Sequence, residues 1–213
     1  MSDDLMFSLP VFDRPEMESL VTREDSAKLK TQLRFKFLNA VRSKNAKEFL
    51  NNELPEPGWT MCVLGIGNFD FWNVIAYALY LAGGEIDFLM LTTWAANRFV
   101  AEEIVQLHNS RTVKEVLLFV DQSFRKRAPD TWAFLLDHTH GVDTFNMYSL
   151  PNHAKIAAFK TSDGRHYVIA GSANLNGNPR LEENFISHSK ELFDFFVSEY
   201  KSFIPRSRKA SKE

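Results

Sequence analysis

The sequence predicts a mixed α/β fold in which a largely parallel central sheet carries helices on both faces. From residue 60 onward, short runs rich in β-branched and aromatic residues alternate with longer amphipathic segments, as in successive strand–helix–strand units. Two further β-prone runs flank Asp163-Gly164, a dipeptide typical of a hairpin turn. With 213 residues, 45% of them hydrophobic, the chain is long enough for one domain with a substantial core.

Residues 1–58 are expected to form an N-terminal arm and one basic helix packed on the domain. The helix is predicted over residues 26–50, where apolar residues recur at helical spacing: Leu29, Leu33, Phe37, Ala40 and Val41. From Ser26 to Lys47 the segment has no acidic residue and seven basic ones, which are Lys28, Lys30, Arg34, Lys36, Arg42, Lys44 and Lys47. The run Leu54-Pro-Glu-Pro-Gly58 then breaks the chain before the first strand.

The domain itself is predicted to span residues 59–204. Before the hairpin, strands are expected at residues 60–66, 86–92, 113–120 and 142–148, and helices at 69–82, 96–108 and 129–136. Hairpin strands at residues 156–159 and 166–170 precede a strand at 183–187 and a terminal helix at 189–203. The basic tail, residues 205–213, is expected to be disordered.

The predicted hairpin gathers four polar groups. A two-residue loop at Asp163-Gly164 would set His153 opposite Asn174 and Lys155 opposite Ser172. Directly opposed residues and residues two apart on a strand share a face, so these side chains would form one patch. The patch would combine an imidazole, an ammonium, a hydroxyl and an amide. Such groups suit an anion with several acceptor oxygens, and phosphate is the ligand that we expect.

The same residues resemble the HxK…GSxN motif of the phospholipase D superfamily, here His153-Ala-Lys155 and Gly171-Ser-Ala-Asn174. The resemblance implies a phospholipase D-like sandwich that cleaves phosphodiesters without metal or cofactor. It implies that His153 is the nucleophile that forms a phosphohistidine, and that Lys155, Ser172 and Asn174 hold the phosphate oxygens. Glu183 stands where the family often places an acidic residue that orients the histidine.

One position departs from the family pattern, which has an aspartate five residues after the lysine. This chain has Lys160 there, and the nearest aspartate is Asp163 at the expected turn tip. Because that aspartate is usually structural, its displacement weakens the motif without emptying the site.

The combined motif occurs once, so one chain supplies only one of the two groups that the reaction needs. Cleavage through a phosphohistidine needs a second group to protonate the leaving alkoxide and then activate water. In the family that group is the histidine of a second motif. We therefore expect a homodimer in which two His153 residues face one phosphate across a two-fold axis.

Basic residues are segregated although the net charge is −2. Besides the basic helix, clusters occur at Arg125-Lys126-Arg127 and in the tail, at Arg206, Arg208, Lys209 and Lys212. Such runs can be solvated helix faces and a solubilising tail, but three of them favour a polyanion, with DNA likelier than RNA. The candidate nucleic-acid-binding residues are Lys28, Lys30, Arg34, Lys36, Arg125, Lys126 and Arg127.

Several other classes are disfavoured by the sequence. One cysteine, Cys62, allows no internal disulfide, and the acidic N-terminus and the lack of a long apolar run predict a cytoplasmic protein without membrane contact. Gly65-Ile-Gly67 lacks the third glycine of a dinucleotide-binding turn. The histidines at 138 and 140 lie at an expected helix end, where a metal site is disfavoured.

Three functions remain open from the sequence. The leading one is a metal-independent phosphodiesterase that cleaves nucleic acid. The second is a non-catalytic, dimeric nucleic-acid-binding module that keeps the phosphate pocket, and the third is a hydrolase of phospholipids or small phosphodiesters. Thr92, Thr93, Trp94, Asp121, Gln122 and Ser123 follow parallel strands and are expected to border the site, where Trp94 and Phe124 either stack on bases or pack locally.

Overall fold

The computed structural model describes residues 34–39, 50, 53–66, 70–175, 181–204 and 208–209. The elements belong to the compact unit Phe35–Glu213, apart from Arg34, the first residue of β1. Strands are β1 (Arg34–Asn39), β2 (Trp59–Ile66), β3 (Ile86–Thr93), β4 (Val113–Asp121), β5 (Phe145–Leu150), β6 (Ile156–Thr161), β7 (His166–Gly171), β8 (Leu181–His188) and β9 (Arg208–Lys209). Helices are α4 (Phe71–Leu81), α5 (Arg98–Asn109), α6 (Phe124–Arg127), α7 (Pro129–Thr139) and α8 (Lys190–Ser202).

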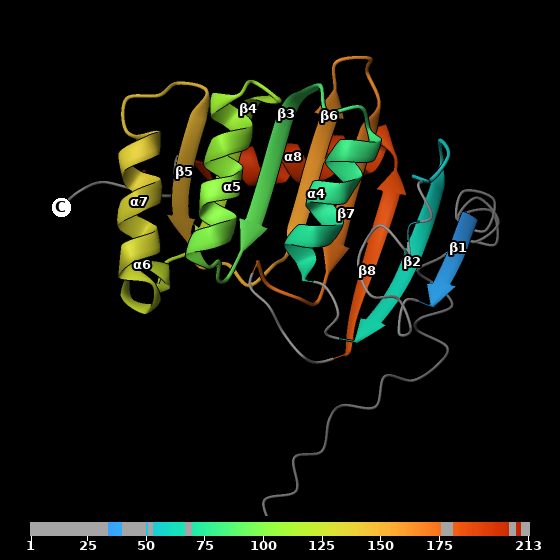
Figure 1. Ribbon diagram of the computed structural model, residues 1–213, viewed down its shortest axis with the longest axis horizontal. Coiled ribbons are helices and arrows are strands. Elements are labelled where there is room, and N and C mark those ends of the chain that lie inside the picture. Colours follow the sequence, from blue (N-terminus) through green and yellow to red (C-terminus); the bar gives the residue numbers. More distant parts are fainter. Residues whose placement is uncertain are drawn as a thin grey trace, which may run out of the picture. The chain divides into compact units, whose positions relative to one another are not determined.

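The strands form a nine-stranded sheet in the order β1-β2-β8-β7-β6-β3-β4-β5-β9. Helices α4, α5 and α7 cover one face, and α8 crosses the other (Figure 1). The predicted mixed α/β architecture with helices on both faces is confirmed. Among the strand pairs whose register is described, only β3–β4 and β4–β5 are parallel, so the sheet is less parallel than expected. The hairpin strand β6 enters antiparallel to β3, and β7, β8 and β2 continue antiparallel from it.

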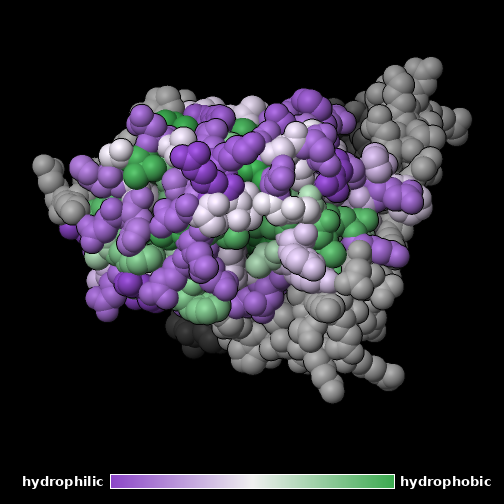
Figure 2. Space-filling model, turned by 45° about the horizontal axis from the view of Figure 1, so that its top comes forward, coloured by the Kyte–Doolittle hydropathy of each residue, from purple (hydrophilic) through white to green (hydrophobic). Residues whose placement is uncertain are grey.

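Each face of the sheet has its own hydrophobic cluster. Under α4, α5 and α7, buried residues include Ile75, Leu89 and Ile104. Under α8, Phe193 and Tyr200 pack on residues of β3 and β4, with Tyr200 and Phe119 ring centroids 5.0 Å apart. The surface in Figure 2 is mainly hydrophilic, and hydrophobic side chains show through in a band across it.

Side-chain caps define where the helices begin. Asp70 accepts a hydrogen bond from the backbone of Asn73 at 2.8 Å, and the Asn73 side chain accepts one from the backbone of Asp70, a reciprocal cap for α4. Asn97 caps α5 through Val100 at 2.9 Å. These caps satisfy amides that a helix start leaves without partners.

Two sequence predictions near the ends of the chain are wrong. Arg34–Asn39 is a strand, whereas a helix was expected over residues 26–50; the run RFKF alternates polar and apolar residues, and that period of two favours a strand. Arg208 and Lys209 of the tail pair with Ser149 and Tyr148 of β5, which covers an otherwise open sheet edge. Lys28 and Lys30 lie outside the described residues.

Candidate active site

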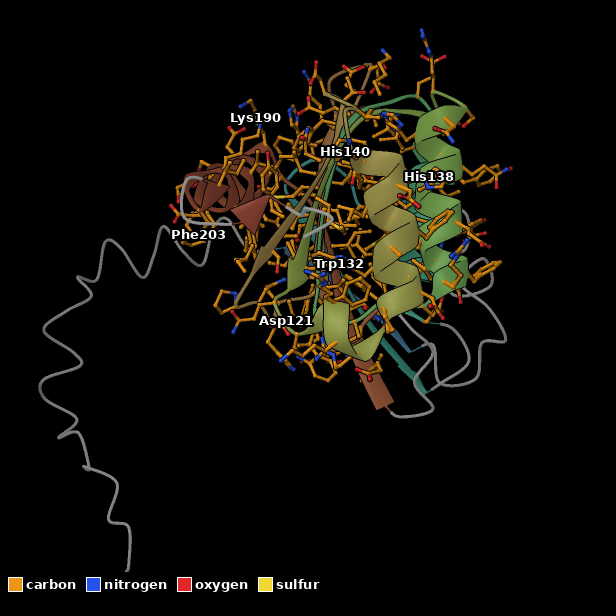
Figure 3. The ribbon with its side chains drawn as sticks, turned by 90° about the vertical axis from the view of Figure 1, so that its left-hand side faces the viewer. Asp121, Trp132, His138, His140, Lys190 and Phe203 are labelled. Carbon is orange, nitrogen blue, oxygen red and sulfur yellow. The ribbon has the colours of Figure 1, made fainter. Side chains whose placement is uncertain are left out.

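The candidate site lies where the parallel strands β3, β4 and β5 end, at the lower edge of the sheet in Figure 1. The loops that leave these strands begin with Trp94, Gln122 and Pro151. The short segment between β5 and β6 carries His153 and Lys155. Figure 3 shows Asp121 at this end, close to α6, whereas His140 and Lys190 lie towards the opposite end.

The hairpin register differs by one residue from the expected one. Ile156 pairs with Ala170, and the amide of Gly171 donates to the carbonyl oxygen of Lys155 at 3.1 Å. The loop has three residues because Thr161 and Arg165 close it at 3.0 Å and Gly164 adopts a positive φ of 88°. The predicted opposition of Lys155 with Ser172 and of His153 with Asn174 is therefore wrong, and Lys155 lies opposite Gly171.

Lys155 and His153 are in direct contact. The Lys155 ammonium lies 2.8 Å from Nδ1 of His153 and donates to the His153 carbonyl oxygen at 2.5 Å. Lys155 is only 7% exposed, whereas His153 is exposed. Burial lowers the pKa of Lys155, and the nearby carboxylate of Glu182 opposes that shift. The contact therefore pairs a largely buried cation with a solvent-facing imidazole.

Ser172 contacts the carboxylate of Glu182, whereas it meets Glu183 at the backbone. Its hydroxyl donates to the Glu182 carboxylate and accepts from the backbone amide of Glu183 at 3.1 Å. The Glu183 side chain is exposed and acts on Cys62, whose thiol pKa is raised first by burial and then by this carboxylate. Strand parity explains the difference, because adjacent residues of β8 point to opposite faces.

Two asparagine oxygens near these groups are buried without a partner in the described part of the chain. They are Oδ1 of Asn174, in the motif, and Oδ1 of Asn184, on β8. Asn184 lies opposite Gly171, the residue that also pairs with Lys155. An unpaired buried acceptor costs free energy, so both Oδ1 oxygens are available to accept a hydrogen bond from a donor.

Asn152 fixes the segment that carries the histidine. Its backbone amide donates to Asp121 at 3.3 Å, and its side-chain oxygen accepts from the amide of Ala154 at 3.1 Å and from the Tyr200 hydroxyl at 3.3 Å. Its amide nitrogen donates to the carbonyl oxygens of Thr93 and Phe119, both at 3.4 Å. This buried network ties the ends of β3 and β4 and the helix α8 to the residue before His153.

The loop after β3 brings an aromatic ring to the histidine. The centroids of Trp94 and His153 are 5.7 Å apart, and the guanidinium of Arg127 lies 3.5 Å from the centroid of the Trp94 ring. The expected border residues Trp94 and Asp121 thus do lie at the site. Phe124 does not: it is fully buried and packs against Trp132, so it takes the local packing role.

Comparison with known proteins supports the fold alone. No family model matches the chain, and no curated protein matches it. Among solved structures, Nuc from Salmonella typhimurium, a phospholipase D family member, aligns with a TM-score of 0.52 and 14% identity over 72% of this chain and 99% of its own. The chain has the phospholipase D fold.

Two other structures align over a similar length. Polyphosphate kinase from Porphyromonas gingivalis has a TM-score of 0.50 at 9% identity over 72% of this phospholipase D-like chain and 27% of its own. NucT from Helicobacter pylori has a TM-score of 0.49 at 14% identity over 71% of this chain and 99% of its own. The likeness to Nuc confirms the fold predicted from the HxK and GSxN residues, while the reaction must be argued from the site.

The basic residues proposed for nucleic acid are only partly described. In the phospholipase D-like domain, Arg125, Lys126 and Arg127 form the short helix α6, directly after the end of β4. Arg34 and Lys36 lie on β1, whose side-chain positions are outside the description. The sequence did not single out Asn152, Tyr200 or Glu182. For Asn152, the available signal was its position directly before the motif histidine.

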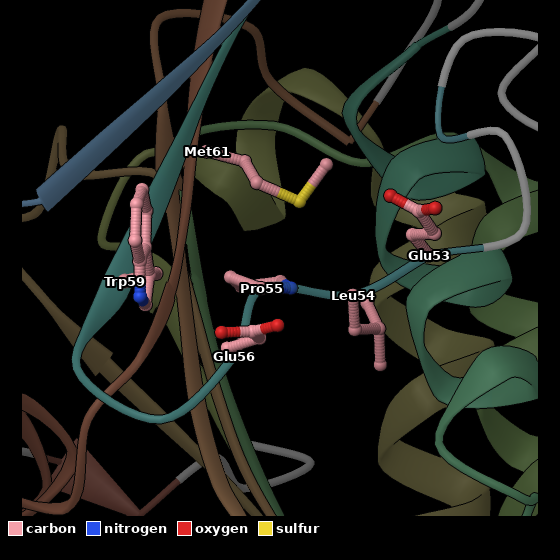
Figure 4. A pocket seen from close by; sticks show the side chains of 6 residues that line it. All are labelled: Glu53, Leu54, Pro55, Glu56, Trp59 and Met61. Carbon is pink, nitrogen blue, oxygen red and sulfur yellow. The ribbon is translucent and has the colours of Figure 1, made fainter.

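Two cavities lie outside this site. One of about 460 Å³ is lined by Glu53, Leu54, Pro55, Glu56, Trp59 and Met61 (Figure 4). Its charged lining residues are carboxylates, which do not suit a phosphate. Another of about 930 Å³ lies around the β6–β7 turn and the start of α8. Within the described residues, no group of three or more His, Cys, Asp and Glu is placed to hold a metal ion, and no helix is long and apolar enough to cross a membrane.

Proposed function

We propose that this chain is a metal-independent phosphodiesterase that cleaves nucleic acid, DNA more readily than RNA, through a phosphohistidine at His153. The observation that carries the proposal is the contact of Lys155 with His153, 2.8 Å from ammonium to Nδ1, at the end of a phospholipase D fold. A buried cation beside an exposed imidazole suits a phosphodiester, because the cation stabilises charge on the phosphoryl oxygens while the imidazole attacks phosphorus.

Substrate binding changes the partners of Lys155. A donor at Nδ1 places the proton of a neutral imidazole on Nε2. When a phosphate oxygen becomes the acceptor of the ammonium, Nδ1 is released. Because His153 is exposed, Nδ1 can then take a proton from solvent while Nε2 gives its own proton up to solvent. Nε2 then has the free electron pair that a nucleophile needs.

The reaction proceeds in two displacements. A ring nitrogen of His153 bonds to phosphorus, the phosphorus–oxygen bond to the leaving group breaks, and the leaving alkoxide takes a proton from a second imidazole. That imidazole then removes a proton from water, which attacks phosphorus and breaks the phosphorus–nitrogen bond. Lys155, Ser172 and Asn174 bind the phosphoryl oxygens, and Glu183 or its neighbour Glu182 supplies the acidic charge that orients an imidazole.

The second imidazole is assigned to His153 of another copy of the chain. The combined HxK and GSxN motif occurs once in the sequence, and His138, whose Nδ1 lies 2.8 Å from the Phe134 carbonyl oxygen, is engaged within α7. A two-fold axis through the phosphate would make both subunits contribute the same residue.

Cleavage of a labelled oligonucleotide in EDTA tests the proposal. The wild-type chain should cleave and become transiently phosphorylated, His153→Ala should do neither, and the control His138→Ala should behave as wild type. Oligonucleotide binding that survives in a wild-type chain without cleavage would instead support the non-catalytic module. Hydrolysis of phospholipid vesicles but not of the oligonucleotide would support the lipid hydrolase.

Subunit mixing tests the shared site. Wild-type and His153→Ala chains are unfolded together and refolded at varied ratios, at constant total protein. If both histidines serve one phosphate, activity should follow the square of the wild-type fraction. A linear dependence would rule out the two-histidine site. So would full activity of a chain that light scattering shows to be a monomer.

A further inference from the structure

The guanidinium of Arg127 lies over the ring of Trp94, beside the candidate nucleophile. Its central carbon is 3.5 Å from the Trp94 ring centroid, and the ring of His153 lies 5.7 Å from that same centroid. The guanidinium therefore cannot be farther from the imidazole than these two separations together. Successive phosphates of one strand advance about 3.4 Å along a duplex axis. When one phosphate lies at the imidazole, the guanidinium is therefore close enough to meet a neighbouring phosphate of the same strand.

Several contacts fix the guanidinium in this position. Its Nη2 donates to the carbonyl oxygen of Trp94 and lies 3.4 Å from Oδ1 of Asp121. Asp121 is itself held by the amides of Ser123, at 2.9 Å, and Asn152, at 3.3 Å. An arginine whose plane is already fixed loses less side-chain entropy when it binds an anion.

The same contacts leave part of the guanidinium available. The Arg127 side chain is 29% exposed, and within the described residues its Nε and Nη1 make no hydrogen bond. Asp121 cancels one positive charge, but Arg125 and Lys126 on α6 are exposed and keep the helix basic. Two unused donors in a fixed plane match the oxygens of a phosphate.

We infer that Arg127, seated on Trp94, forms a second phosphate subsite, which binds a phosphate neighbouring the one attacked at His153. The inference rests on the proposed function and names its substrate class: a strand with successive phosphodiesters rather than a lipid or another compound with a single phosphodiester. The subsite aligns the strand, so that the phosphate beside it meets His153 and Lys155.

Binding in an inactive background separates the subsite from the chemistry. All variants carry His153→Ala, and a fluorescent single-stranded oligonucleotide is titrated in EDTA at several salt concentrations. Arg127→Ala should weaken binding about tenfold and lower the slope of log affinity against log salt by about 0.7 to 1. Lys190→Ala removes an exposed cation towards the opposite end of the domain; this control should weaken binding less than threefold, and Arg127→Lys should fall between the two.

Cleavage in the active background distinguishes a subsite from a support for Trp94. Arg127→Ala should lower kcat/KM about tenfold on the oligonucleotide and less than twofold on bis(4-nitrophenyl) phosphate, which has a single phosphodiester. Equal losses on both substrates, or binding losses equal to those of Lys190→Ala, would overturn the inference. If the wild-type chain cleaves neither substrate while the Arg127-dependent binding persists, the proposed function fails and the subsite stands.

Discussion

Gly171 lies directly opposite Asn184 on the neighbouring strand, so closely that a methyl group at Gly171 would collide with the Asn184 side-chain oxygen. The same methyl group would lie 2.8 Å from the carbonyl oxygen of Glu183, a backbone atom that cannot rotate away. The first residue of the GSxN motif is thus a glycine because β7 and β8 approach each other here, beside Lys155.

Replacement of Gly171 by alanine should separate the two strands at the site. We expect Gly171→Ala to lower the free energy of unfolding by about 1–3 kcal/mol, the usual cost of overpacking, and to lower cleavage at least tenfold because Ser172 moves with the strand. Denaturant unfolding and oligonucleotide cleavage measure the two effects.

The Asn184→Ala background provides the control. It removes the side-chain oxygen but leaves the Glu183 carbonyl, so Gly171→Ala should cost less there, with a coupling energy of at least about 0.5 kcal/mol. Purely additive losses in the double variant would show that the contact with Asn184 does not set the requirement for glycine.

Lys155 should be needed for activity and not for stability. Burial lowers its pKa, so the folded state disfavours the charged ammonium, and this cost at neutral pH is relieved as pH rises through the lowered pKa. Lys155→Met should therefore leave the melting temperature at pH 7 unchanged or raised, while cleavage falls by at least about 10²-fold.

Lys160, on the strand β6 that directly follows Lys155, is the matched control for Lys155. It is half-buried and pairs with His166 near the turn, so Lys160→Met should retain cleavage. A large loss of stability in Lys155→Met would contradict the view that the buried ammonium is kept for chemistry.

The alkaline limb of the pH–rate profile distinguishes the role of Glu182 from that of Glu183. The Glu182 carboxylate raises the pKa of Lys155 against the effect of burial, so its removal should lower that pKa further. Glu182→Gln should then shift the alkaline limb to lower pH, because the ammonium loses its proton earlier. Glu183→Gln, an adjacent change of equal charge, should leave this limb in place; a shift in that variant alone would return the role to Glu183.

The order of elements from Trp59 to Ser202 could be predicted because each has a local cause. Helices such as α4 and α5 repeat apolar residues at helical spacing, and β3 and β4 are apolar runs of strand length between turn residues. The contact of His153 with Lys155 was likewise within reach, since two residues of one short segment form it.

Features that change when the strand register shifts by one residue could not be predicted. A three-residue loop in place of two moves every pair of the hairpin by one position, and the parity of β8 decides which of two adjacent glutamates meets Ser172. Asn152 bonds to residues 31 to 59 positions away, and Arg127 bonds to Trp94, 33 positions away; no local pattern encodes such contacts.

Asp163 should support the turn and not the chemistry. It is the aspartate nearest to the family position occupied by Lys160, and it lies beyond the end of β6, whose six residues span about 20 Å from the site. Its carboxylate accepts from Nε of Arg165 at 2.9 and 3.0 Å and from the Thr161 hydroxyl, and these bonds lower its pKa to about 2. We therefore expect Asp163→Asn to keep wild-type cleavage at pH 7.

The stability of Asp163→Asn should depend on pH in a defined direction. A carboxyl whose pKa is lower in the folded state than in the unfolded chain, about 3.9, stabilises the fold above that value. The contribution is lost as pH falls towards 2. Wild type should therefore be the more stable protein in denaturant unfolding at pH 7, and the difference should shrink between pH 4 and pH 2. A difference that is constant over this range, or a loss of cleavage at pH 7, would mean that Asp163 acts on the site rather than on the turn.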